Sequence, residues 1–305
     1  MSSELARRVA FGVVAAPLAV AIVIYGGAPL AALLAIASAL AAWEFFRMAR
    51  ATGLTPLEDT GIVIAGLIPL VVHARFLHLY EPGTPLGEVS LICVVVLAVL
   101  AMTIWLRGVS GKPTAAVSST LFGVAYTGGM LSFAYGIRYH EYAFAPATIH
   151  LGSWTFTTPS GGLLLLIPLL ATWASDTGAY AVGRAIGRHK LIPSVSPGKT
   201  IEGAIGGLLT TILVVWALTS GFLRPGAHLD FRGHSWGVIL FGALVSAAAQ
   251  VGDIAESLLK RDAGVKDSSR LIPGHGGVLD RVDSLLFVLP ISYVCFGSLL
   301  TWAPS

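Results

Sequence analysis

Charged residues are scarce in this sequence: Asp, Glu, Lys and Arg together make up 11% of the 305 residues, whereas hydrophobic residues make up 55%. A water-soluble domain usually carries about 25% charged residues, so this chain has too few of them to cover an ordinary water-facing surface. The mean hydropathy of +0.80 is likewise too high for a chain whose whole surface faces water. The composition therefore excludes an ordinary soluble protein and predicts that lipid is the solvent.

Cysteine is also scarce. Cys93 and Cys295 each lie inside an apolar block and form no CxxC pair, so no disulfide framework is expected. A P-loop is absent as well: Gly198-Lys199-Thr200 resembles the end of one, but Pro193 stands where the motif needs a glycine. Lys199 and Thr200 are still candidates for a phosphate contact at the start of a helix.

Long apolar blocks are what the sequence has in abundance. A helix needs about 20 mostly apolar residues to cross the hydrocarbon core of a bilayer. We therefore predict an all-α, polytopic integral membrane protein with about nine transmembrane helices, in the blocks 9–25, 28–47, 61–80, 88–106, 115–135, 162–183, 201–219, 236–258 and 284–302. Arg7 and Arg8 before the first block resemble the start of a signal peptide, but the length of that block predicts an uncleaved first span.

We expect one membrane domain over 1–305. Within it, the N-terminal helices of 1–135 carry no recognisable motif, and 162–305 holds the predicted catalytic helices and cytoplasmic loops. The second region contains every segment discussed below.

The basic residues predict an orientation, because Lys and Arg in short loops favour the cytoplasm. With the N-terminus inside, 15 of the 19 basic residues fall on the cytoplasmic side of the cell (inner) membrane, including those of the charged loops 184–200 and 259–283. Clustered cations suit phosphates and anionic lipid headgroups. The alternative is that the basic loops only set the topology.

One segment, 250–283, is dense in charge. Asp253, Glu256, Ser257 and Lys260 recur at helical spacing and would share one helix face. A carboxylate buried at a helix end is costly unless it is paired or bound to a metal. The segment holds eleven charged residues, six acidic and five basic: Asp253, Glu256, Lys260, Arg261, Asp262, Lys266, Asp267, Arg270, Asp280, Arg281 and Asp283.

Two further features of this segment have an alternative interpretation. Asp280 and Asp283 begin the ninth block, where helix capping is the alternative to metal binding. The glycines around His275 allow positive φ and let backbone N–H groups face a phosphate, as at Gly276 and Gly277. Any tight loop also uses glycine, and His275 would then be a loop histidine without a role.

Asp176 is a candidate functional residue outside the segment 250–283, because it is an acid inside an apolar block. An ionisable residue within a membrane span indicates a functional site by default. The alternative is an ion pair with a cation of a neighbouring helix.

The segment 257–283 resembles the signature of the phosphatidate cytidylyltransferases, also called CDP-diacylglycerol synthases. Segments 175–180 and 196–202 are similar to further motifs of that family, whereas the first five blocks match only in their polytopic character. The signature positions met here are Ser257, Lys260, Arg261, Lys266, Asp267, Pro273, His275, Gly276, Gly277, Asp280, Arg281 and Asp283.

The resemblance implies transfer of a cytidylyl group from CTP to phosphatidic acid, with Mg²⁺ or another divalent cation. The lipid phosphate is itself the nucleophile, so catalysis depends on positioning and charge neutralisation. The implied metal ligands are Asp253, Asp280, Asp283 and Asp176; the implied catalytic residues are Asp253, Ser257, Lys266, His275, Asp280 and Asp283; and the implied substrate-binding residues are Lys199, Thr200, Lys260, Arg261, Arg281, Gly276 and Gly277.

The expected partners are CTP, phosphatidic acid and membrane lipids, with no nucleic acid. A homodimer is also expected as one option, since Gly203 and Gly207 form a small-xxx-small pair that packs helices. Three alternatives stay open: a CTP-dependent enzyme that uses a polyprenol or an archaeal ether lipid, a transporter, and a scaffold without chemistry. The absence of an internal repeat at matching positions disfavours the transporter.

Overall fold

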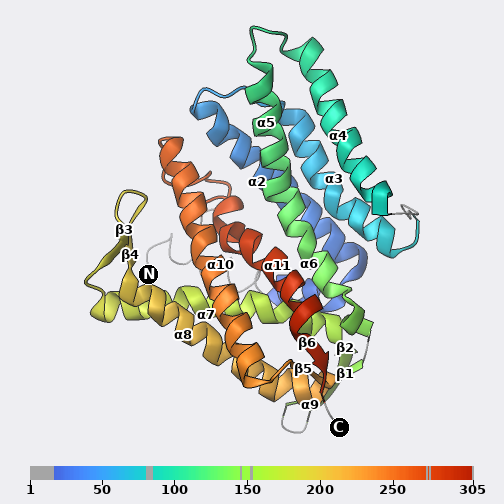
Figure 1. Cartoon of the computed structure of the whole chain (residues 1–305), viewed down its shortest axis with the longest axis vertical. Helices are drawn as coiled ribbons and strands as arrows, with labels where there is room; N and C mark the ends of the chain where they lie inside the picture. The colour runs from blue at the N-terminus through green and yellow to red at the C-terminus, as the bar shows by residue number, and fades with distance from the viewer. Residues whose placement is uncertain are drawn as a thin grey trace. The chain divides into compact units, whose positions relative to one another are not determined.

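The computed structural model describes residues 17–79, 85–144, 146–151, 154–272, 274 and 276–303, and most of them are helical (Figure 1). The predicted all-α, polytopic class is confirmed, because seven helices of this described part are long and apolar enough to cross a membrane. They lie within α2 (Gly27–Ala51), α3 (Glu58–Phe76), α4 (Pro85–Leu106), α7 (Ser160–Ile186), α8 (Ile201–Leu218) with its continuation, α10 (Ser235–Asp262) and α11 (Leu279–Leu299).

The other two predicted spans differ from this pattern. The block 115–135 is helical but interrupted, since α5 (Pro113–Val124) and α6 (Met130–Arg138) are joined by the π-helical turn η1 (Ala125–Gly129). The block 9–25 is described only from residue 17, where it is helical to residue 25. Arg7, Arg8 and the expected uncleaved start of the first span lie outside the described residues.

Short strands occur between and after the helices as three two-stranded antiparallel sheets. They pair β1 (Pro146–Leu151) with β2 (Trp154–Pro159), β3 (Lys190–Ile192) with β4 (Ser196–Thr200), and β5 (Leu229–Phe231) with β6 (Leu300–Trp302). The remaining elements are the 3-10 turn η2 (Glu141–Phe144), the π-helical turn η3 (Thr219–Leu223) that continues α8, and the short helix α9 (Arg224–Ala227).

The chain forms two compact units, and each unit is made of several separate segments of the sequence. Of the described residues, unit 1 contains 27–132 and 259–281, and unit 2 contains 17–26, 133–258 and 282–303. Helices α6, α10 and α11 therefore contribute residues to both units. The signature loop between α10 and α11 belongs to unit 1, together with the N-terminal helices.

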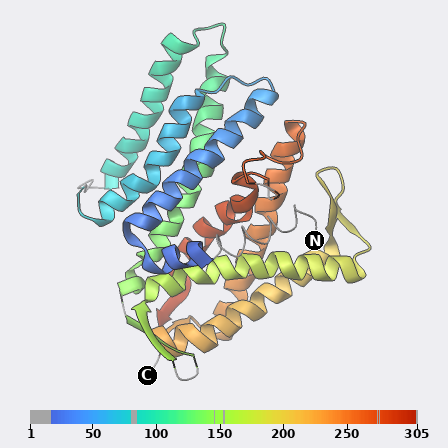
Figure 2. The same cartoon turned by 180° about the vertical axis from the view of Figure 1, so that it is seen from behind.

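In unit 1, helices α2, α3 and α5 pack closely, and the two opposite views show them side by side with α4 (Figures 1 and 2). A Cβ atom at Gly61 or at Gly123 would overlap the ring of Phe46, so glycine permits the close approach to α2. Phe46 itself is fully buried. The outer faces of α3 and α4 carry exposed large apolar side chains, as lipid-facing helices do.

In unit 2, helices α7 and α8 run closely against each other through small residues. A Cβ atom added at Gly203 would lie 2.8 Å from the Ala179 carbonyl oxygen, and one at Gly207 would lie 2.9 Å from that of Ser175. Close backbone contact through small residues is the usual way in which helices associate in lipid. The small-xxx-small pair is thus used within the chain, between α7 and α8.

Candidate functional site

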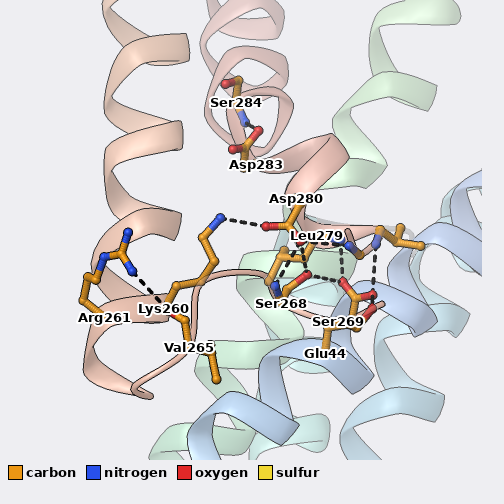
Figure 3. A network of polar contacts seen from close by, with 12 residues as sticks. Glu44, Lys260, Arg261, Val265, Ser268, Ser269, Leu279, Asp280, Asp283 and Ser284 are labelled. Carbon is orange, nitrogen blue, oxygen red and sulfur yellow. Dashed lines mark hydrogen bonds and ion pairs between the residues drawn. The ribbon is translucent and has the colours of Figure 1, made fainter. Parts of the chain in front are cut away.

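Asp280 organises the signature loop of unit 1 (Figure 3). Its Oδ1 atom accepts a hydrogen bond from the Lys260 Nζ atom at 2.7 Å. Its Oδ2 atom accepts from the backbone N–H of Ser268 at 3.0 Å, from the Ser268 hydroxyl at 2.8 Å and from the backbone N–H of Gly277 at 2.8 Å. The last turn of α10, the middle of the loop and its end are therefore held to the first turn of α11.

The ion pair between Lys260 and Asp280 is largely shielded from solvent, with side-chain exposures of 13% and 6%. A buried ion pair is tolerated only when further hydrogen bonds satisfy its remaining lone pairs. The three donors from Ser268 and Gly277 supply these bonds on the second carboxylate oxygen. The sequence predicted Lys260, Gly277 and Asp280 as site residues, and the structure brings them together.

Glu44 is a site residue that the sequence did not reveal. It lies on α2, is fully buried, and its carboxylate accepts four hydrogen bonds from the signature loop and the start of α11. The donors are the hydroxyls of Ser268 (2.9 Å) and Ser269 (2.5 Å) and the backbone N–H groups of Val278 (2.9 Å) and Leu279 (2.6 Å). The signal was available, since Glu44 is an acid inside the block 28–47.

We call these residues the Glu44–Asp280 network; its members are Glu44, Lys260, Ser268, Ser269, Gly277, Val278, Leu279 and Asp280. Gly277 and its neighbour Gly276 are required by space and backbone geometry. Gly276 has φ +80°, and a Cβ atom at Gly277 would overlap the Ser268 hydroxyl and both carboxylate oxygens of Glu44. The predicted importance of this glycine pair thus has a steric cause in unit 1.

A second polar cluster lies in unit 2, at α7, α10 and the strand β4 that leads into α8. The Lys199 Nζ atom lies 2.8 Å from an Asp253 carboxylate oxygen. One turn earlier on α10, the Gln250 amide donates to the Ser246 hydroxyl at 3.0 Å, and that hydroxyl lies 3.2 Å from the hydroxyl of Ser175. Polar side chains therefore line the contact between these helices, and the predicted Lys199 and Asp253 are part of it.

Asp283 and Glu256 also belong to unit 2. Asp283 accepts a hydrogen bond from the backbone N–H of Ser284 at 2.6 Å, while Glu256 is fully buried on α10. Gly252 brings α10 and α11 together, since its added Cβ atom would lie 2.7 Å from the Asp283 carbonyl oxygen. The predicted helical spacing from Asp253 to Lys260 is confirmed, because α10 is continuous to Asp262.

Three predicted residues have other local contacts. The Thr200 hydroxyl caps α8 by accepting from the Gly203 N–H at 3.1 Å. The Arg261 guanidinium donates to the Val265 carbonyl oxygen at 3.5 Å. Asp176 lies on an exposed position of α7, whereas the adjacent Ser175 is buried.

The remaining predicted residues are accessible or undescribed. Lys266 and Arg281 are exposed, and Ser257 is half-buried. Within the part of unit 1 that the structure describes, neither Lys266 nor Arg281 forms an ion pair. His275 and its neighbour Pro273 lie outside the described residues.

The described residues contain no group of three His, Cys, Asp or Glu side chains placed to hold one metal ion. Asp280 Oδ1 accepts from Lys260 and Oδ2 accepts from Ser268 and Gly277, so a metal ion at Asp280 would compete with these donors. The assignment of Asp176, Asp253, Asp280 and Asp283 as ligands stays a prediction.

Comparison with known proteins places these features in a family. A profile of the cytidylyltransferase family matches residues 6–299. The chain is similar to the phosphatidate cytidylyltransferase of Synechocystis sp., with 34% identity over 300 residues, 94% of each chain. It is 46% and 45% identical to those of Staphylococcus haemolyticus and Staphylococcus aureus over 137 residues, 45% of this chain and 50% of each relative. On the match along nearly its whole length, the chain belongs to the cytidylyltransferase family.

Proposed function

We propose that this protein transfers the cytidylyl group of CTP to phosphatidate and releases CDP-diacylglycerol and pyrophosphate. The observation that carries the proposal is the similarity to a phosphatidate cytidylyltransferase over 94% of the chain. The Glu44–Asp280 network supports it, because several signature residues meet there in a buried polar cluster. The transporter and scaffold alternatives have no comparable support.

The proposed cytidylyl transfer requires no covalent intermediate with the protein. An oxygen of the lipid phosphate attacks the α-phosphorus of CTP, and the bond from that phosphorus to the bridging oxygen of the β-phosphate breaks. The electron pair leaves with pyrophosphate. No Ser or Cys nucleophile is required, and catalysis depends on alignment and on neutralising the phosphate charges.

The cations fall into two groups. Lys266 and Arg281 are exposed and make no ion pair among the described residues of unit 1, so we assign phosphate contacts to them first. Lys199 and Lys260 each hold a carboxylate, and a bound phosphate would compete with that carboxylate for the ammonium group. Arg261, Thr200, Gly276 and Gly277 complete the proposed substrate-binding set, with Ser257 and His275 orienting phosphate oxygens.

A divalent cation, Mg²⁺ by preference, is part of the proposal. Carboxylate oxygens are the ligands that Mg²⁺ prefers, usually beside substrate phosphates and water. Such an ion supplies positive charge to the triphosphate. Asp253 and Asp283 of unit 2 are the first candidates, with Asp176 as a further one, and Asp280 of unit 1 comes last because an ion there would compete with the Lys260, Ser268 and Gly277 donors.

The reaction is assigned to the cytoplasmic face, with the N-terminus on the same side. The support is the distribution of basic residues, since 15 of 19 fall on one side when the predicted spans alternate. The homodimer stays a prediction without support from Gly203 and Gly207, because both of these glycines pack against α7 of the same chain.

The test is conversion of labelled CTP to a lipid-soluble product by the detergent-purified protein, with phosphatidate and Mg²⁺, and with and without EDTA. We expect CDP-diacylglycerol and an equal amount of pyrophosphate, both abolished by EDTA. Product formation that persists in EDTA would refute the metal requirement. Folded protein that is inactive with phosphatidate but active with a polyprenyl phosphate or an ether lipid would refute the proposed acceptor.

A further inference from the structure

Glu44 stands apart from the signature in sequence but not in space. It lies on α2, more than 200 positions before the loop that it contacts, and its side chain is fully buried within unit 1. Its carboxylate accepts four hydrogen bonds from described residues, and all four donors lie within 268–279 (Figure 3). The N-terminal helices thus reach the signature loop through one carboxylate.

The contacts explain why an acid stands here. Val278 and Leu279 present N–H groups at the start of α11, which have no partner within the helix and carry its positive dipole end. A carboxylate satisfies these groups and suits that dipole. The hydroxyls of Ser268 and Ser269 add one donor to each carboxylate oxygen, which offsets the burial of the charge.

The same contacts connect Glu44 to Asp280. The Ser268 hydroxyl lies 2.9 Å from Glu44 Oε2 and 2.8 Å from Asp280 Oδ2, so a single hydroxyl proton is shared between the two carboxylates. The Gly277 N–H donates to Asp280. Only glycine fits at this position, because a Cβ atom would overlap the Glu44 carboxylate. A shift of the Glu44 side chain therefore moves Ser268, Gly277 and, through them, Asp280.

We propose that Glu44 is a positioning residue of the transferase: it fixes the described signature-loop residues 266–272 and 276–281 in the conformation in which their cations bind phosphate. The inference rests on the proposed function, because the loop geometry affects turnover only if this loop binds the substrates. Glu44 touches no reacting atom in this role. It acts through Ser268, Gly277 and the first turn of α11.

The test compares the wild type with Glu44→Gln, which keeps the size of the side chain but replaces one acceptor oxygen by a donor amide. Either orientation of that amide faces one of the α11 N–H groups, which then loses its acceptor. The matched control is Glu58→Gln, at the start of α3, where the acid pairs with Arg50 at 2.6 Å and takes no part in the network.

Two measurements are made on each protein. Amide hydrogen exchange without substrate should be faster in Glu44→Gln only over peptides within 263–281. Steady-state kinetics should show a kcat/KM lower by about 10- to 100-fold with an increased KM for CTP, as expected for misplaced substrate groups. A purely structural role would instead raise exchange throughout α2, α3 and α5 and lower the active fraction at unchanged KM.

Each outcome decides the question. Wild-type exchange and kinetics in folded Glu44→Gln would overturn the inference while leaving the proposed function intact, whereas a wild type without CDP-diacylglycerol would overturn the proposed function. If Glu44→Gln does not fold, Ser269→Ala removes only one of the four donors and should give the same changes to a smaller degree. Exchange and KM unchanged in Ser269→Ala would then overturn the inference.

Discussion

At the scale of single residues, the Asp280 carboxylate is held by four donor groups of described residues. Lys260 occupies one carboxylate oxygen, and Ser268 and Gly277 occupy the other. An amide at this position has only one acceptor atom. It would therefore place a donor either against the Lys260 ammonium or against the loop donors, and the buried Lys260 charge would lose its counter-charge.

We expect Asp280→Asn to lower kcat/KM by at least about 100-fold, since the loop and Lys260 lose their common anchor. The stability of unit 1 should fall by about 3 kcal/mol, the order found when one partner of a buried ion pair is removed. The measurements are CDP-diacylglycerol formation and thermal unfolding of the purified protein. Asp262→Asn, at an exposed position at the end of α10, is the control and should behave as wild type.

A double variant separates stability from chemistry. Lys260→Met together with Asp280→Asn removes both charges and should recover part of the lost stability without recovering activity. Near-normal turnover in folded Asp280→Asn would contradict the site assignment altogether.

The sequence predicted some of these residues and missed others for physical reasons. Lys260, Gly277 and Asp280 were predicted because their residue types recur at close spacing within one segment. Glu44 was missed although it is an acid inside an apolar block, because its partners lie far away along the chain and residue spacing reports only local geometry. Thr200 has a local role that the sequence analysis did not name, since its hydroxyl caps α8, and its contact with phosphate stays a prediction.

At the scale of elements, hydropathy predicted the long helices well because the bilayer imposes their length. It missed the π-helical turns η1 and η3 and the three short sheets, whose formation depends on local hydrogen bonding and not on apolar length. The small residues of α8 were recognised, but their partner was not. The spacing of Gly203 and Gly207 indicates a close helix contact without showing which helix provides it.

Gly207→Leu tests that contact. The new side chain would start 2.9 Å from the Ser175 carbonyl oxygen and 3.2 Å from the Ala179 Cβ atom, so α7 and α8 must separate. We expect a loss of about 1–3 kcal/mol in folding stability, the usual result of overpacking, seen as a lower thermal unfolding midpoint in detergent. Leu213→Ala, at an exposed position on the same helix, should have little effect.

The oligomeric state provides a second measurement on the same variant. If Gly207 packs on α7 of its own chain, Gly207→Leu lowers stability and leaves the mass of the detergent-solubilised particle unchanged. A variant of wild-type stability that dissociates from a dimer to a monomer would contradict the contact within the chain and restore the homodimer interpretation of these glycines.

At the scale of the whole molecule, the two units interleave along the chain. Residues 259–281, which include the signature loop, belong to the unit of the N-terminal helices, although the sequence predicted no motif in those helices. Hydropathy cannot predict this grouping, because it contains no information about contacts between distant segments. The buried Glu44 carboxylate supplies direct contacts within this unit, because it lies on an N-terminal helix and binds the signature loop.

The orientation of the molecule is testable through one helix. Helix α10 has 28 residues, or about 42 Å at 1.5 Å per residue, which exceeds the thickness of about 30 Å of a hydrocarbon core. Arg232, just before α10, and Asp262, at its end, are both exposed. If α10 spans the bilayer, they lie on opposite faces, and the basic residues predict Asp262 on the cytoplasmic side.

Single cysteines at these two positions distinguish the faces, after Cys93→Ser and Cys295→Ala remove the native thiols. A membrane-impermeant maleimide added to intact cells should label Arg232→Cys and should reach Asp262→Cys only after permeabilisation. The opposite pattern would place the signature loop outside, away from cytoplasmic CTP, and would contradict the proposed reaction at that face. Labelling of both positions in intact cells would contradict a spanning α10, because one aqueous phase would then reach both ends of a helix longer than the hydrocarbon core.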